Sequence, residues 1–219
     1  MLNLHFFLGV FLKTSDAFFL VGGLPRDYIF FLKSKKIKPE QFSTSFFRIN
    51  FEDFLNFITK KTFCDIDIAT VLTPKHVGEI LDEHFPNSKR IRNFATNSIS
   101  FQNAKIDITS TRIDYDCDGK NAKMKLGASI FRDSHRRDFT FNALYINSQG
   151  NIFDFHNGIE DIYNNKIQFI GNATTRINED FTRIKRYQKF CERFGMENPE
   201  IDSAIDYIIK NSKTPIIMR

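Results

Sequence analysis

The sequence predicts an α+β protein, with strands and helices mixed over residues 1–170 and helices alone over residues 171–219. Two observations predict this division. Up to about residue 170, short apolar runs of strand length recur between turn residues. From about Thr175 the apolar positions take a helical period, because Ile184, Tyr187, Cys191 and Phe194 fall on one stripe that ends near Gly195. A chain of 219 residues is long enough for one such domain with a helical appendage.

The first predicted elements are a strand, a tight turn and a helix. Residues 17–23 (AFFLVGG) are apolar and end in a glycine pair, which is typical of a buried strand entering a turn. Residues 24–33 follow as a helix with Pro25 in its first turn. Residues 34–61 are rich in Lys and Phe and poorly patterned, so they predict no clear element.

A strand, a helix and two hairpins come next. Residues 64–70 (CDIDIAT) have the composition of a buried strand, and Thr73 with Pro74 opens a helix. Alternating runs around residues 102–105 (QNAK) predict one hairpin, and residues 139–158 predict a second with its turn at residues 148–151.

Composition and charge narrow the class of protein. A formal charge of +5 and a pI near 9.0 permit a polyanionic partner. The three cysteines are widely spaced, which argues against a disulfide framework or a zinc site and favours a reducing cytoplasm. The apolar residues 1–23 lack the basic region and cleavage site of a signal peptide, and no later run has the roughly 18 apolar residues needed to cross a bilayer. We therefore expect a cytoplasmic protein that does not enter a membrane.

Two carboxylates share one face of the strand at residues 64–70. Because side chains alternate along a strand, Asp65 and Asp67 project together, whereas Ile66 and Ile68 project into the core. Two such carboxylates repel each other, and a divalent cation between them relieves the repulsion. The alternative is a pair of surface aspartates on an edge strand, and the Asp-x-Asp pattern alone does not decide between the two.

Four further stretches carry polar residues at element boundaries, and each has a plain structural explanation. Residues 21–27 (VGGLPRD) place bare backbone N–H groups at a helix start, where they can hold a triphosphate or serve only as a turn. Residues 136–144 (RRDFTFNAL) fit a surface ion-pair cluster before a strand, and residues 154–162 (DFHNGIEDI) fit a strand end and turn. Residues 178–186 (NEDFTRIKR) fit a helix with acids in its first turn.

Together and in this order, the five stretches resemble the bacterial-type tRNA nucleotidyltransferase and poly(A) polymerase family, which comprises the class II CCA-adding enzymes and their relatives. The resemblance extends from about Ala17 to Gly195. It implies a nucleotidyltransferase head over residues 1–170, with a small mixed, mainly antiparallel sheet flanked by helices. It also implies a helical neck over residues 171–219, which is incomplete relative to the family and contains a base-reading helix. Residues 34–60 are an insertion of unknown purpose relative to the family.

The resemblance assigns the carboxylates to catalysis. Asp65 and Asp67 match the metal-binding pair, where two Mg²⁺ ions would activate the 3′-hydroxyl of RNA and stabilise the departing pyrophosphate. Asp107, on a neighbouring predicted strand, matches a position where relatives often carry an acid, and it is either a third catalytic carboxylate or an ordinary hairpin aspartate.

The resemblance also assigns a nucleotide site for CTP and ATP. Asp180 and Arg183, three apart on the predicted helix, would act as a protein template, because an acceptor and a donor suit the amino group and bare ring nitrogen that cytosine and adenine share. Lys189 stands where many relatives have arginine, which keeps the charge but loses bidentate geometry. The full set implied to bind nucleotide is Gly22, Gly23, Arg26, Arg137, Asp138, Asn142, Asp180, Arg183, Arg186 and Lys189.

Three functions fit the resemblance. The first is CCA addition to the tRNA 3′ end, or addition of only CC or only A. The second is poly(A) polymerisation, which the missing Arg-Arg-Phe run in residues 88–101 disfavours. The third is a nucleotide-binding remnant that needs a partner chain to supply body and tail helices. Glycosyltransferases also use Asp-x-Asp with a metal, but residues 136–144 and 178–186 have no place in them.

Overall fold

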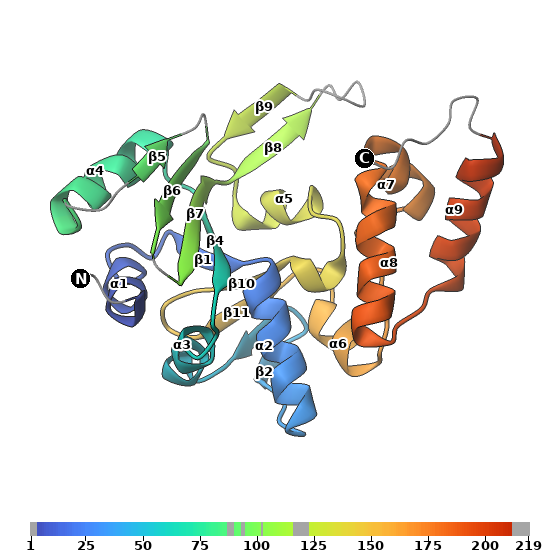
Figure 1. Ribbon diagram of the computed structural model, residues 1–219, viewed down its shortest axis with the longest axis horizontal. Helices are drawn as coiled ribbons and strands as arrows, with labels where there is room; N and C mark the ends of the chain where they lie inside the picture. The colour runs from blue at the N-terminus through green and yellow to red at the C-terminus, as the bar shows by residue number, and fades with distance from the viewer. Residues whose placement is uncertain (1–3, 87–89, 93–94, 102, 116–122, 212–219) are drawn as a thin grey trace.

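The computed structural model describes residues 4–86, 90–92, 95–101, 103–115 and 123–211. Within them, a nine-stranded mixed sheet forms the centre of the molecule, in the order β2-β3-β11-β10-β1-β4-β7-β6-β5 (Figure 1). Every neighbouring pair of that sheet is antiparallel except β4 and β7. The strands are β1 (Phe18–Val21), β2 (Glu40–Ser43), β3 (Phe46–Arg48), β4 (Cys64–Thr70), β5 (Arg90–Arg92), β6 (Thr96–Ser100), β7 (Ala104–Ser110), β10 (Leu144–Ile146) and β11 (Asn151–Asp154), with β8 (Arg112–Tyr115) and β9 (Lys123–Leu126) paired separately.

The helices flank the sheet and continue beyond it. They are α1 (Leu4–Phe11), α2 (Gly23–Ser34), α3 (Phe51–Thr59), α4 (Pro74–His84), α5 (Ile130–His135), the 3-10 helix η1 (Thr140–Asn142), α6 (Gly158–Tyr163), α7 (Ala173–Glu179), α8 (Thr182–Phe194) and α9 (Pro199–Asn211). Helices α1 to α4 contribute to the main apolar core on one face of the sheet, whereas Ile130 of α5 packs against the other face. In the described part of the chain, no helix is long and apolar enough to cross a bilayer.

Several local predictions are confirmed, and with them the α+β fold. Thr73 caps α4 by accepting a hydrogen bond from the His76 backbone N–H, with Pro74 at the first helical position. Strands β6 and β7 form the first predicted hairpin, and β10 and β11 form the second. Gly195 ends α8 in the left-handed conformation, at φ 63°.

The insertion at residues 34–60 is structured. Strand β3 pairs with β11, and β2 pairs with β3, so the insertion extends one edge of the sheet. Helix α3 adds Phe54, Leu55 and Ile58 to the core. The sheet is therefore larger than the small sheet that the resemblance implies, because the inserted residues pair with a strand that lies far away in the sequence.

The apolar core continues across residue 170. Phe139 stacks on Phe169 at 4.5 Å between ring centroids and meets Phe190 of α8 at 5.3 Å. Helices α8 and α9 lie beside the sheet domain at one end of the molecule (Figure 1). The proposed boundary at residue 170 stays a prediction, and residues 212–219 of the predicted neck lie outside the described residues.

Candidate active site

The two predicted metal ligands lie on the polar face of β4. Ile66 and Ile68 are buried while Asp65 and Asp67 are open to solvent, as the alternation predicts. The parallel pairing of β4 with β7 places Asp107 in register with Asp67, so the three aspartates lie on neighbouring positions of one sheet face. Ser98 Oγ donates to Asp107 at 2.5 Å, and Lys105 Nζ donates to it at 2.7 Å.

Asp67 is in a setting that suits a bound cation. Although part of the Asp67 side chain is open to solvent, the surrounding protein partly desolvates its carboxyl, and this raises the pKa of Asp67. Arg137 lowers that pKa, whereas the charges of Asp107 and Asp65 raise it further. A divalent cation would relieve this cost, and carboxylate oxygens are the ligands that Mg²⁺ prefers. Among the described residues, no group of three or more His, Cys, Asp and Glu side chains is arranged as a metal site. The donor set that fits the ion is therefore the Asp65 and Asp67 pair, and Asp107 is held by Ser98 and Lys105.

The glycine pair brings backbone close to Asp67. Gly22 has φ 77° and ψ −128°, a conformation that only glycine adopts readily. A Cβ at Gly22 would lie 3.1 Å from Asp67 Oδ2. Gly23 begins α2, so the N-terminus of this helix starts beside the carboxylates. Both glycines thus occupy the position that the sequence predicts for them.

Arg137 faces a cavity of about 310 Å³ beside Asp67. The polar side chains that line it include Asp67, Thr96, Thr109, Arg112, Arg136 and Arg137. Arg137 Nε donates to Tyr145 Oη at 2.8 Å, and Arg137 Nη2 donates to Asp133 Oδ2 at 3.2 Å. An arginine held in this way presents positive charge to the cavity, and a guanidinium can pair with an anionic group such as a phosphate.

Asp133 and Tyr145 support this site, and the sequence predictions omit both. Asp133 is fully buried and accepts hydrogen bonds from Tyr145 Oη (2.7 Å), Arg136 Nε (2.8 Å) and the Arg112 backbone N–H (3.1 Å) besides Arg137. Burial raises the pKa of Asp133, but Arg137 and Arg136 outweigh it and bring the pKa below its usual value. The spacing of Asp133 to Arg136 and Arg137, three and four residues apart, is the sequence signal that could have indicated it.

Asp138 and Asn142 lie deeper, under α8. Asn142 Nδ2 donates to Asp138 Oδ1 at 3.1 Å, while Asn142 Oδ1 accepts from Arg26 Nη1 at 2.9 Å. Residues 140–142 form η1 rather than the start of the predicted strand, and this turn brings Asn142 within hydrogen-bonding distance of Asp138. The guanidinium of Arg26 is engaged here and does not line the cavity beside Asp67, so its predicted phosphate contact stays a prediction.

The prediction that Asp180 and Arg183 share a face of one helix is wrong. Helix α7 ends at Glu179 and α8 begins at Thr182, because the Asp180 carboxylate accepts from the Thr182 N–H (2.9 Å) and hydroxyl (2.6 Å). The buried Arg183 guanidinium donates to Glu179 and to the Arg176 carbonyl.

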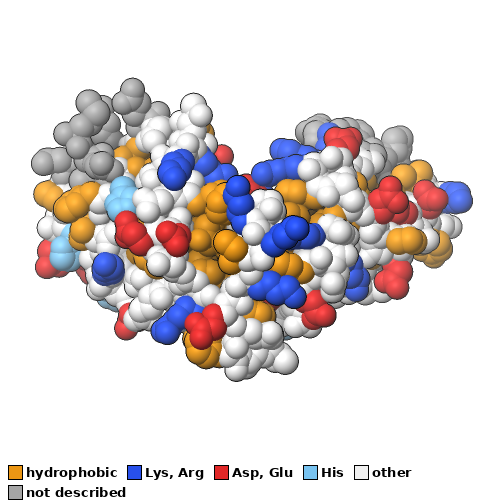
Figure 2. All heavy atoms as spheres, turned by 90° about the horizontal axis from the view of Figure 1, so that it is seen from below, with side chains coloured by type: hydrophobic (Ala, Val, Ile, Leu, Met, Phe, Trp, Pro, Cys, Tyr) orange, Lys and Arg blue, Asp and Glu red, His pale blue; other side chains and the backbone are white. Residues whose placement is uncertain are grey.

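Arg186 is the arginine that faces Asp180. Its Nη2 lies 3.6 Å from Asp180 Oδ2, and its Nη1 lies 3.2 Å from Asp138 Oδ2. Burial raises the pKa of Asp180, and the bonds from Thr182 together with Arg186 and Arg183 bring it below its usual value. Lys189 is exposed one turn further along α8. Figure 2 shows Lys and Arg side chains gathered around the hollow between the two ends of the molecule, with apolar side chains among them.

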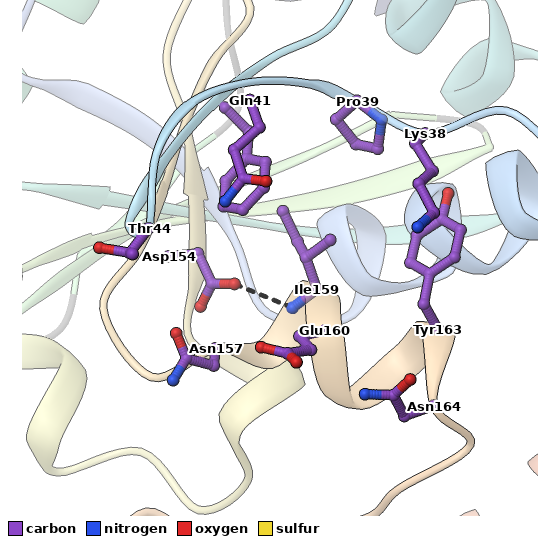
Figure 3. A pocket seen from close by; sticks show the side chains of 11 residues that line it. Lys38, Pro39, Gln41, Thr44, Asp154, Asn157, Ile159, Glu160, Tyr163 and Asn164 are labelled. Carbon is purple, nitrogen blue, oxygen red and sulfur yellow. Dashed lines mark hydrogen bonds between the residues drawn. The ribbon is translucent and has the colours of Figure 1, made fainter.

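A second cavity, of about 360 Å³, is lined by none of the predicted site residues. The insertion contributes Lys38, Pro39 and Gln41 to it, and α6 contributes Glu160 and Tyr163 (Figure 3). The carboxylate at its floor, Asp154, accepts backbone hydrogen bonds from His156, Gly158 and Ile159, which fixes the start of α6.

The sequence matches a family model described as "Poly A polymerase head domain" over residues 18–168. The chain belongs to this family. Its relatives include "CCA tRNA nucleotidyltransferase 1, mitochondrial" of Homo sapiens, 34% identical over 155 residues, which are 68% of this chain and 35% of that protein. They also include "CCA-adding enzyme" of Staphylococcus epidermidis, 30% identical over 171 residues, which are 77% of this chain and 40% of that protein. The chain thus spans well under half the length of these curated relatives.

Solved structures share the fold. "The structure of CCA-adding enzyme apo form II" superposes with a TM-score of 0.68 at 24% identity and covers 95% of this chain and 44% of that chain. "Thermotoga maritima CCA-adding enzyme complexed with tRNA_CCA" superposes with a TM-score of 0.60 at 24% identity, and the match covers 97% of this chain and 44% of that chain. At this identity the likeness establishes a nucleotidyltransferase head fold and nothing more.

Proposed function

We propose that this chain catalyses template-independent addition of C and A residues to the 3′ end of tRNA, using CTP, ATP and Mg²⁺. The observation that carries the proposal is the meeting of three features at one end of β1 and β4. These are the carboxylates of Asp65 and Asp67, the glycine turn at Gly22 and the cavity that Arg137 faces. Membership of the family and relatives named for CCA addition support the same reaction.

Each residue has a role that follows from its place. Asp65 and Asp67 would hold Mg²⁺, which when bound would supply Lewis-acid stabilisation of the charge that develops in phosphoryl transfer. Gly22 and Gly23 allow the triphosphate to approach the backbone N–H groups at the start of α2. Arg137, held by Tyr145 and Asp133, pairs with phosphate in the cavity beside Asp67.

The base lies at the N-terminal end of α8. Asp180 and Arg186 already form an acceptor and donor pair there, and Asp138 and Asn142 order the floor beneath it. For Arg183 to read a base with Asp180, it has to leave Glu179, so nucleotide binding would change the pairing of this arginine.

Lys189 adds positive charge on the exposed side of the same helix. Asp107 orients Lys105 and adds negative charge beside Asp67.

The test is incubation of the purified chain with tRNA that lacks its 3′ end, Mg²⁺ and each labelled NTP in turn. Incorporation of CTP and then ATP, with rejection of UTP and GTP, supports CCA addition. Extension with ATP alone would instead identify a poly(A) polymerase or an A-adding specialist. Activity only after addition of a second chain would identify a required partner. Nucleotide binding with no transfer under any of these conditions would contradict the proposal. The cytoplasmic location stays a prediction, and the human relative is named as mitochondrial.

A further inference from the structure

The side chain of Arg26, on α2, is buried against α8. This side chain is 8% exposed, and its guanidinium carbon lies 4.9 Å from the ring centroid of Phe190 and 5.6 Å from that of Phe194. Its Nε and Nη2 atoms donate to Asp27 Oδ1 at 2.9 and 2.7 Å. The Arg26 guanidinium thus contacts two aromatic rings of α8 and the Asp27 carboxylate, and these contacts hold α2 against α8.

Asp27 links α2 to the far end of α8. Its second oxygen, Oδ2, accepts from Arg193 Nη2 at 3.0 Å, and Lys61 Nζ lies 3.5 Å from the same oxygen. Next to this ion pair, Phe30 stacks on Phe194 with ring centroids 4.0 Å apart and an angle of 4° between the planes. Burial raises the pKa of Asp27, but Arg26 and Arg193 bring it below the usual value, so the carboxylate stays charged.

The same network reaches the near end of α8. Arg26 donates to Asn142, Asn142 donates to Asp138, and Asp138 faces Arg186, which in turn faces Asp180. Both ends of α8 are therefore tied to the start of α2, where the glycine turn meets the metal ligands. A change at Asp27 would alter the placement of α8 without touching the cavity beside Asp67.

We propose that Asp27 is a positioning residue for base choice, which holds α8 and its base-reading end at a fixed place relative to the glycine turn through Arg26 and Arg193. The proposal rests on the proposed function, since base choice has a meaning only if the chain transfers nucleotides. It assigns Arg26 to the support of α8 in place of the phosphate contact predicted from the sequence.

The first test reads the position of α8 without using activity. The chain has no tryptophan, so Phe194→Trp introduces a single indole at the contact between α2 and α8, and its emission is excited at wavelengths where the six tyrosines do not absorb. In that background Asp27→Asn should shift the emission to longer wavelength, because the indole becomes more hydrated. Lys61→Gln is the matched control, because it also removes a cation from Asp27. Since Lys61 follows α3 and is not part of α8, the emission should not change. Circular dichroism verifies that each variant is folded.

The second test reads base choice as the ratio of kcat/KM for ATP to that for GTP. Asp27→Asn and Arg193→Gln should each lower this ratio about threefold to tenfold, with a smaller effect in combination than the product of the two, because they break one shared ion pair. Arg193→Lys should keep most of the ratio, since it keeps the charge and Arg193 contacts Asp27 through one nitrogen, Nη2.

The outcomes separate the two proposals. An unshifted emission in folded Asp27→Asn, or an unchanged ratio with normal kcat, would overturn the positioning role. If the unmutated chain transfers no nucleotide, the proposed function fails, and the fluorescence test still decides whether Asp27 holds α8 in place.

Discussion

Asp133→Asn should destabilise the protein strongly, because Asp133 is a fully buried acceptor for four donors. Tyr145 Oη and Arg137 Nη2 bond to Oδ2, whereas Arg136 Nε and the Arg112 N–H bond to Oδ1. An asparagine offers one oxygen, and in either orientation its NH₂ group faces two donors that lose their acceptor. Leaving buried charges without their partner costs about 3–5 kcal/mol. For a chain of this size, that loss corresponds to a decrease in Tm of roughly 6–20 °C.

Urea unfolding followed by circular dichroism measures this loss directly. Asp206→Asn is a matched control, because Asp206 is exposed on α9 and should change the free energy of unfolding by less than about 0.5 kcal/mol. At temperatures where Asp133→Asn is folded, the KM for CTP should also rise, since Arg137 loses one of the two side chains that accept its hydrogen bonds. A free energy of unfolding within about 1 kcal/mol of the unmutated protein would refute the role of Asp133 as the buried centre of the site.

Three further predictions concern the turn, the base pocket and pH. Gly22→Ala should abolish nucleotide transfer, because φ is 77° at this position and the new Cβ would lie 3.1 Å from Asp67 Oδ2. Gly78→Ala is the control, because a Cβ at Gly78 has no atom within 4 Å, and it should leave transfer unchanged. Equal transfer rates for the two variants would contradict this prediction. Asp180→Asn keeps an oxygen that can cap α8 but removes the charge, so it should relax the choice of C and A over U and G in single-turnover assays; unchanged selectivity would exclude Asp180 from base reading. Burial lowers the pKa of His156 to about 4, so the unfolded chain binds more protons between pH 4 and 6.5 and stability rises with pH there. His156→Gln should weaken that rise in Tm, and an unaltered pH profile would contradict it.

The features that could be predicted from the sequence depend on local signals. The alternation in residues 64–70 places Asp65 and Asp67 on one face because strand geometry has a period of two, whatever the strand pairs with. Thr73 caps α4 and Gly195 ends α8 through bonds and conformations within a few residues.

The features that the sequence did not indicate depend on distant partners or on competition for the backbone. Phe47 of β3 is buried because β3 pairs with β11, which lies far along the chain, so residues 34–60 show no period of their own. Arg26 is buried by Phe190 and Phe194, and nothing near Arg26 in the sequence indicates this. Asp180 breaks the predicted helix because its side chain bonds to Thr182 in place of a helical turn.

The central claim is that Asp65 and Asp67 hold the Mg²⁺ ion used for nucleotide transfer to tRNA. The most direct measurement is incorporation of one labelled CMP into tRNA lacking its 3′ end, followed over a Mg²⁺ titration for the unmutated chain and for Asp65→Asn, Asp67→Asn and Asp206→Asn. We predict Mg²⁺-dependent incorporation by the unmutated chain and by Asp206→Asn, and none above background by the other two variants while they stay folded. Incorporation near the unmutated rate by either Asp65→Asn or Asp67→Asn would contradict the claim.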